Sequence, residues 1–266
     1  MSEFKLSNRI MFAIVMQDEK LCKQFIERLF PQRKVKEISI ATTEKSIITG
    51  IKSKSVRLDV MFEGDDQVYD VEMQVTEEKE IAKRTRYYHS AIDRQILNTG
   101  ENYEDLREAY VIFVCLYDPF KLGESMYQFQ MLDKNLGLKL NDGCNTIILN
   151  TKCPSEKVPC ELKSFFEYVN SGELGPDESD EFVLGLHEKV EEVNLDEEVR
   201  EIMTVEQEIN LWKNRADKAY DKGLSEGVEQ GRAEGEKAGA EKEIQSIIEK
   251  MRANGLSEDL IAQIVG

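Results

Sequence analysis

Residues 56–74 read Val-Arg-Leu-Asp-Val-Met-Phe-Glu-Gly-Asp-Asp-Gln-Val-Tyr-Asp-Val-Glu-Met-Gln, and they contain the most informative pattern of the chain. Apolar and polar residues alternate on both sides of an acidic turn at 63–66, which predicts a β-hairpin. In the second strand this alternation places Asp70, Glu72 and Gln74 on one face. If the turn is centred between residues 65 and 66, Asp59 lies directly across from Glu72, at a Cβ separation of about 4.5–5.5 Å.

The facing acids, Asp59 and Glu72, predict a metal site. Two carboxylates held so close repel each other unless a cation lies between them. A hard divalent ion, Mg²⁺ before any other, suits paired acids together with backbone carbonyls and water. Periodicity alone also fits a plainer interpretation, in which these residues form an exposed sheet face of ordinary polar side chains.

The segments around the hairpin predict an α/β fold with a mixed central sheet and flanking helices. Residues 77–99 have helical periodicity, and residues 109–117 form an almost continuous apolar run, typical of a strand buried on both faces. A hairpin followed by a helix and a buried strand implies a mixed sheet covered by helices. Further elements are expected as a helix at 7–30, an edge strand at 34–40, an added hairpin of strands at 127–131 and 146–149, and a helix at 160–169.

The helix expected at 77–99 carries a possible phosphate-binding stripe. Arg84, Tyr88, Ala91 and Gln95 recur at i, i+4, i+7 and i+11, and further basic residues, Arg86 among them, lie close by. If this stripe faces the acids of the hairpin, a guanidinium would lie beside a phosphate bound there. The alternative is an amphipathic helix whose basic side chains are simply solvated.

The order of these motifs resembles the recombination-promoting nuclease and transposase family of the PD-(D/E)XK nuclease superfamily. The matching segments are Arg57-Leu58-Asp59-Val60, residues 69–74, residues 84–88, Gly100-Glu101-x-Tyr103, residues 110–120 and Leu149-Asn150-Thr151. The resemblance covers nearly the whole chain. It implies a restriction-endonuclease-like core followed by a long helical C-terminal extension.

The same resemblance implies a metal-dependent DNA endonuclease. Asp59, Glu72 and Gln74 are then the catalytic residues, and Asp59, Glu72 and the carbonyl of Met73 hold Mg²⁺, with Mn²⁺ as the alternative ion. Gln74 stands where the superfamily has a Lys, a replacement that the resemblance implies is common in this family. Arg84, Arg86, Tyr88 and Gln95 are the expected substrate-binding residues.

The resemblance leaves two points open. Some nucleases of the superfamily take an extra acid from the first helix, where Asp18, Glu19 and Glu27 lie in this chain. A catalytically degenerate protein of the same fold, acting through oligomerisation or partner binding, is the competing functional hypothesis.

The charge of the chain is unevenly distributed. The net charge is −17, but residues 1–100 hold 17 Lys and Arg against 16 Asp and Glu, so the acidity belongs to the C-terminal part. A local basic groove for DNA therefore remains compatible with the overall charge. Five cysteines without a C-x-x-C pair, and no run of about 20 apolar residues, predict a cytoplasmic protein with no membrane segment.

The sequence predicts three parts: a nuclease-like domain at 1–176, an acidic helical segment at 177–222, and a glycine-repeat helix with a short terminal helix at 223–266. The repeat is formed by glycines at positions 223, 227, 231, 235 and 239. Each glycine costs a helix about 1 kcal/mol relative to alanine. The segment is therefore either a flexible spacer or a helix for self-association, which would make the protein a homo-oligomer through its C-terminal helices.

Overall fold

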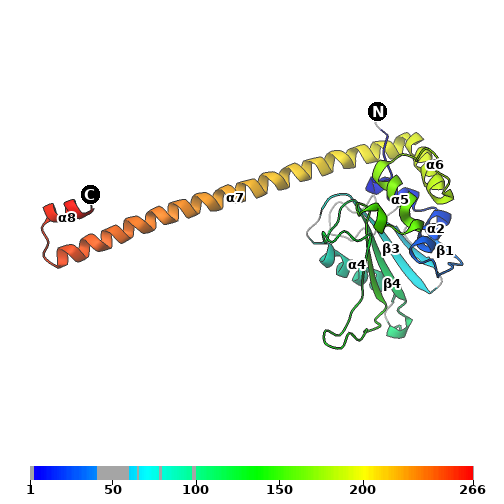
Figure 1. Cartoon of the computed structure of the whole chain (residues 1–266), viewed down its shortest axis with the longest axis horizontal. Helices are drawn as coiled ribbons and strands as arrows, with labels where there is room; N and C mark the ends of the chain where they lie inside the picture. The colour runs from blue at the N-terminus through cyan, green and yellow to red at the C-terminus, as the bar shows by residue number, and fades with distance from the viewer. Residues whose placement is uncertain (1–2, 41–59, 65, 78–79, 98–99, 266) are drawn as a thin grey trace. The chain divides into compact units, whose positions relative to one another are not determined.

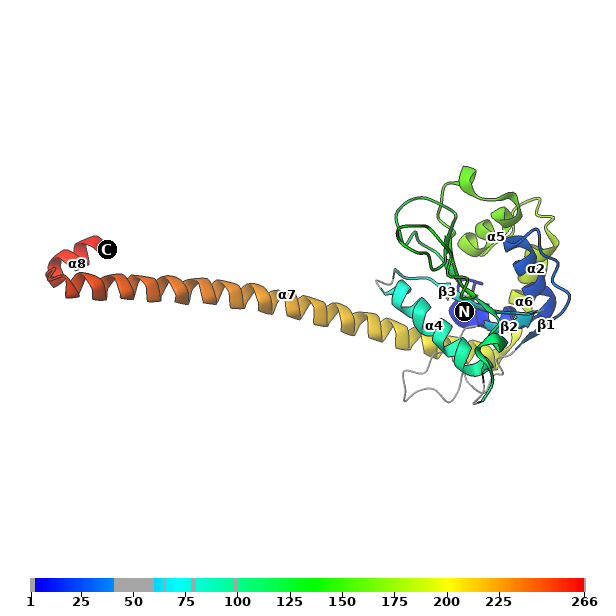
Figure 2. The ribbon, with the colours of Figure 1, turned by 90° about the horizontal axis from the view of Figure 1, so that it is seen from below.

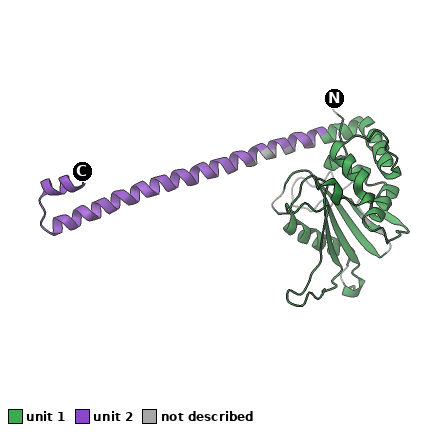
Figure 3. Ribbon diagram, in the orientation of Figure 1, with its two compact units in different colours: residues 1–203 green, residues 204–266 purple. Residues whose placement is uncertain are grey.

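The computed structural model describes residues 3–40, 60–64, 66–77, 80–97 and 100–265. Its contacts divide the chain into two units, residues 1–203 and residues 204–266 (Figure 3). Residues 177–203 therefore belong to the first unit, although the sequence predicted a boundary at residue 176.

A six-stranded mixed sheet forms the centre of the first unit, in the order β1-β2-β3-β4-β6-β5 (Figure 1). The first three strands pair antiparallel, β3, β4 and β6 run parallel, and β5 returns antiparallel at the far edge. The predicted α/β class and mixed sheet are thus confirmed. The strands are β1 (Ile38–Ile40), β2 (Val60–Gly64), β3 (Gln67–Gln74), β4 (Glu108–Cys115), β5 (Met126–Phe129) and β6 (Cys144–Asn150).

The central hairpin has the register predicted from its acidic turn. Val60 of β2 lies opposite Val71 of β3, and Met61 lies opposite Asp70. The prediction of an added hairpin at 127–131 and 146–149 is only half right. β5 and β6 do pair antiparallel, but β6 also pairs parallel with β4 and so lies inside the sheet.

Helices cover both faces of the sheet, and each face has its own core. α4 (Ile81–Ile96) lies on one side of the strands (Figure 2), and its residues Ile81, Tyr88 and Ile92 are buried there. On the other side lie α2, α5 and α6, together with α1 (Figure 2). These four helices are α1 (Arg9–Val15), α2 (Glu19–Leu29), α5 (Cys160–Ser171) and α6 (Glu181–Leu195). Two short 3-10 turns, η1 (Tyr103–Asp105) and η2 (Ser155–Lys157), also belong to this unit.

The single helix predicted over residues 7–30 is wrong. α1 ends at Val15, and Asp18 begins α2 by accepting a hydrogen bond from the backbone N–H of Leu21 at 3.0 Å. An aspartate that caps the first turn of a new helix competes with continuation of the previous one.

The N-terminal segment is fixed to the end of α6. The backbone N–H of Phe4 donates to Oδ1 of Asn194 at 3.0 Å, and Nδ2 of Asn194 donates to the carbonyl of Phe4 at 2.9 Å. Arg28 of α2 and Asp180, the N-cap of α6, form an ion pair. α6 therefore packs as part of the nuclease-like core rather than as a separate acidic segment.

The second unit consists of most of α7 (Glu197–Ala253) and of α8 (Glu258–Val265), which confirms the predicted helical extension. α7 continues as a helix through all five glycines of the repeat. A Cβ added at any of these five positions would lie in open space. Across the part of the chain that the structure describes, no helix combines the length and the apolar character needed to span a membrane.

Candidate active site

β3 carries three polar side chains on the face of the sheet that α4 covers. Asp70, Glu72 and Gln74 alternate along β3 with apolar residues that belong to the opposite core, as the alternation predicted. Their exposed fractions are 0%, 1% and 5%, respectively. These side chains are therefore enclosed, which excludes the plainer interpretation of an exposed polar sheet face.

Glu72, Gln74, Arg84 and Tyr88 form one hydrogen-bonded group, here called the Arg84 cluster. Nη1 of Arg84 donates to Oε1 of Gln74 at 2.7 Å, and Nη2 donates to the hydroxyl oxygen of Tyr88 at 2.8 Å. Nη2 of Arg84 also lies 3.5 Å from Oε2 of Glu72, and the Tyr88 hydroxyl donates to the same carboxylate oxygen at 3.3 Å. A single guanidinium thus connects two polar positions of β3 with α4.

Two aromatic rings, one on α4 and one on β4, hold Arg84 against the sheet. Arg84 and Tyr88 are four residues apart on α4 and therefore share one face of the helix. The guanidinium carbon lies 5.4 Å from the centre of the Tyr88 ring and 5.6 Å from that of Phe113 on β4, distances at which cation–π attraction acts. The two rings also stack, with centroids 5.9 Å apart. Aromatic packing therefore holds the charged group in the site.

The amide of Gln74 is oriented by both of its ends. Its oxygen accepts from Arg84, and its nitrogen donates to the backbone carbonyl of Met73 at 3.1 Å. Gln74 thus connects the guanidinium to the carbonyl that the sequence predicted as a metal ligand.

The donor atoms of this site suit a hard divalent cation. Glu72 offers carboxylate oxygens and Met73 a carbonyl oxygen, and oxygen ligands are preferred by Mg²⁺ and Mn²⁺. Asp59, the second predicted acid, lies outside the described residues. Within the described ranges no group of three or more His, Cys, Asp or Glu side chains is arranged to hold a metal. The predicted metal site therefore depends on Asp59 joining Glu72.

The structure does not bring every predicted site residue to the Arg84 cluster. Arg86 and Gln95 lie on α4, but both side chains are exposed and neither belongs to the cluster. The acids near the first helix are also remote from Glu72, because α2 packs on the opposite face of the sheet and Asp18 caps it. Neither Glu19 nor Glu27 is therefore placed with Glu72.

Sequence reasoning gave no role to Thr151, which fixes the strand ends near the site. Its backbone N–H and its hydroxyl both donate to the carbonyl of Cys115 at 3.0 Å. The next N–H after Cys115, that of Leu116, donates to the carbonyl of Gln74 at 2.9 Å. The ends of β3, β4 and β6 are thereby joined beside Gln74. The available signal was a polar Asn150-Thr151 pair directly after an apolar strand.

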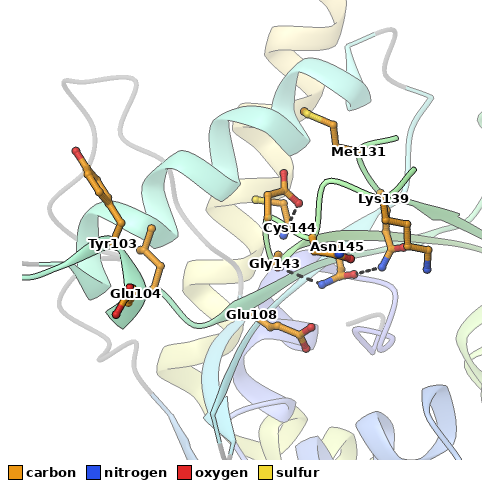
Figure 4. A pocket seen from close by; sticks show the side chains of 12 residues that line it. Tyr103, Glu104, Glu108, Met131, Lys139, Gly143, Cys144 and Asn145 are labelled. Carbon is orange, nitrogen blue, oxygen red and sulfur yellow. Dashed lines mark hydrogen bonds between the residues drawn. The ribbon is translucent and has the colours of Figure 1, made fainter. Parts of the chain in front are cut away.

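A separate pocket of about 460 Å³ opens near the start of β4 and β6 (Figure 4). Tyr103 and Glu104 line one part of it, and Lys139 and Asn145 line another (Figure 4). No member of the Arg84 cluster is among its lining residues. Gln74 is the last residue of β3, whereas the pocket lies near the first residues of β4 and β6. Because these three strands run parallel, the pocket and Gln74 lie at opposite ends of the strands.

No curated protein and no solved structure matches this chain. The family model described as PD-(D/E)XK nuclease family transposase matches residues 7–163, which is more than half of the 266 residues. The match includes all six strands and the Arg84 cluster. This chain therefore belongs to the PD-(D/E)XK nuclease family transposases.

Proposed function

We propose that this chain is an Mg²⁺-dependent DNA endonuclease of the recombination-promoting, transposase-like kind, which hydrolyses phosphodiester bonds with metal-activated water. Phosphodiester hydrolysis needs acids that hold the ion, a group that orients water, and positive charge for the phosphate. The observation that carries the proposal is the Arg84 cluster, in which the buried Glu72 carboxylate, the Gln74 amide and the Arg84 guanidinium lie together.

Each residue of the proposed site has a distinct role. Asp59, Glu72 and the carbonyl of Met73 hold Mg²⁺, with Mn²⁺ as the alternative ion. When bound, the ion supplies an activated water and positive charge at the phosphate. Gln74 orients the water through its amide. Because an amide carries no charge, Arg84 provides the positive side chain that the superfamily's Lys otherwise provides.

The proposed substrate is DNA, bound along α4. Arg84 and Tyr88 contact the phosphate next to the metal, whereas the exposed side chains of Arg86 and Gln95 contact the backbone further along. The near balance of charge over residues 1–100 allows such a local contact despite the acidic C-terminal part. We further propose that the protein is cytoplasmic and assembles through its C-terminal helices.

The proposal is tested with purified wild type, Asp59→Ala and Glu72→Gln. Calorimetry measures Mg²⁺ binding, and nicking of a supercoiled plasmid measures cleavage in the same samples. We expect both variants to lose metal binding and nicking together, because each removes one acid. Glu104→Gln is the matched control, since this exposed acid lines the separate pocket. Unchanged nicking by Asp59→Ala would contradict the catalytic assignment.

The second candidate function is a degenerate member of the family that acts through oligomerisation or partner binding. Two observations favour it: Gln74 supplies no positive charge, and Arg84 already contacts Oε2 of Glu72. Absence of Mg²⁺ binding by the wild type, even with DNA present, would select this candidate over the endonuclease.

A further inference from the structure

Glu72 has a cationic partner in the structure, the guanidinium of Arg84. Its side chain is 1% exposed, and Nη2 of Arg84 lies 3.5 Å from its Oε2. A carboxylate buried to this extent is costly unless positive charge compensates it. Arg84 therefore provides positive charge that compensates this carboxylate.

The contact to Glu72 is the longest of the three that the Arg84 guanidinium makes within the cluster. Its contacts to Gln74 and Tyr88 measure 2.7 Å and 2.8 Å, whereas the contact to Glu72 measures 3.5 Å. Hydrogen bonds weaken with distance, and 3.5 Å is beyond the usual range for an N–H donor. Among these three contacts, the hydrogen bond to Glu72 is therefore the weakest, and a divalent ion bound at Glu72 would replace the positive charge that Arg84 supplies there.

Arg84 can also reach the solvent side of the site. Its side chain is 24% exposed, while that of Glu72 is almost completely enclosed. A planar guanidinium matches two oxygens of a phosphate as well as it matches a carboxylate. Two cations close to one carboxylate oxygen repel each other, most strongly where water is excluded.

We infer that Arg84 is an exchangeable counter-ion and positioning residue. It pairs with Glu72 in the metal-free protein and transfers to a DNA phosphate when a divalent ion takes its place at Glu72. This inference rests on the proposed metal-dependent nuclease function. Because each ligand removes an obstacle to the other, metal and DNA binding strengthen one another, and the coupling is reciprocal.

The test measures Mn²⁺ affinity by electron paramagnetic resonance, with and without a short duplex whose linkages resist hydrolysis. Wild type is compared with Arg84→Met and with Lys83→Met. Lys83 is the adjacent, exposed cation, and among the described ion pairs it is paired only with Glu80. Replacing Lys83 with Met makes the same change in net charge as replacing Arg84 with Met. Without DNA, we expect Arg84→Met to bind Mn²⁺ about 5-fold or more tightly than wild type.

The duplex provides the second comparison. It should raise the Mn²⁺ affinity of wild type and of Lys83→Met, and this increase should be lost in Arg84→Met. Equal Mn²⁺ affinities of wild type and Arg84→Met without DNA would overturn the exchange and leave the nuclease proposal standing. Failure of all three proteins to bind Mn²⁺ would overturn both.

A measurement on the wild type avoids dependence on the stability of the variant. The side-chain Nε–H signal of Arg84, followed by NMR, should shift when Mg²⁺ is added and shift again when the duplex follows. If calorimetry shows that Mg²⁺ binds while this signal stays in place, the exchange is overturned.

Discussion

His89 follows Tyr88 on α4 and is 8% exposed. Its Nε2 is 3.1 Å from the hydroxyl of Thr146, and among the described residues its Nδ1 has no hydrogen-bond partner. Burial lowers the pKa of His89, against a smaller opposing effect from Asp142. At neutral pH the folded protein therefore holds this imidazole in its uncharged form.

We expect His89 to make the folded state acid-sensitive. The unfolded chain takes up the proton near pH 6.5, whereas the folded chain takes it up only at lower pH, so the free energy of unfolding falls as pH drops below about 6.5. In His89→Gln this slope should be shallower, by at most about 1.4 kcal/mol per pH unit. Urea denaturation between pH 8 and about pH 5 measures it.

The control for this prediction is Thr146→Val. It removes the hydroxyl that contacts Nε2 but keeps the imidazole, so its stability curve should lie lower and retain the slope of wild type. Parallel curves for wild type and His89→Gln would contradict the prediction, because they would show that the pKa of this imidazole is the same in the folded and the unfolded state.

Single residues of the site were predictable to different degrees. The two-residue period of a strand was sufficient to place Asp70, Glu72 and Gln74 on one face. The pattern of α4 could not separate Arg84 from Arg86, because both are basic residues on a charged helix. The difference arises from Phe113 and Tyr88, whose rings hold one guanidinium against the sheet. Such a contact joins segments far apart in the sequence.

At the scale of elements, the glycines of α7 make a stabilising substitution predictable. Gly231→Ala should raise the local stability of the helix by about 1 kcal/mol, because alanine has the higher helix propensity and its Cβ meets open space. Native-state hydrogen exchange of the amides around residue 231 measures the change as slower exchange.

Gly172→Ala is the contrasting variant. Gly172 ends α5 with φ +72°, and a Cβ there would collide with the side chain of Lys5. This substitution should therefore destabilise the first unit.

Faster exchange around residue 231 in Gly231→Ala would contradict the helical state of the repeat.

Whole elements were predicted best where their pattern was unambiguous. The almost continuous apolar run at 109–117 is typical of a strand buried on both faces, and β4 is such a strand. The position of β6 was not predictable, since a short apolar strand suits both an added hairpin and an internal parallel pair. Its pairing with β4 is decided by contacts across the sheet. The break at Asp18 likewise depends on a side-chain cap that periodicity does not register.

At the scale of the whole molecule, the limit of the first unit can be tested by truncation. A chain ending at Met203 should unfold cooperatively, because it retains every helix of the core. A chain ending at residue 176 lacks Phe182 and Leu186, which are fully buried in that core, so it should melt at lower temperature and aggregate. Thermal denaturation and size-exclusion chromatography distinguish the two.

Equal thermal stability of the two truncated chains would contradict the assignment of α6 to the core. The sequence suggested residue 176 because Gly172, Gly175 and Pro176 interrupt the pattern and the composition becomes acidic beyond them. Acidic composition does not exclude a buried face, however. α6 carries its charges outward and buries Val183 and Val190.

The hydrogen bonds between Phe4 and Asn194 have a consequence for synthesis on the ribosome. The partners are 190 residues apart, so at typical translation rates the first helices wait about 10–40 s for α6 to emerge. The described buried apolar residues on the α4 side of the sheet all precede Asn150, the end of β6. One half of the domain can therefore be assembled while Phe12 and Phe25 are still uncovered. The nascent chain should need chaperone protection longest at its own beginning.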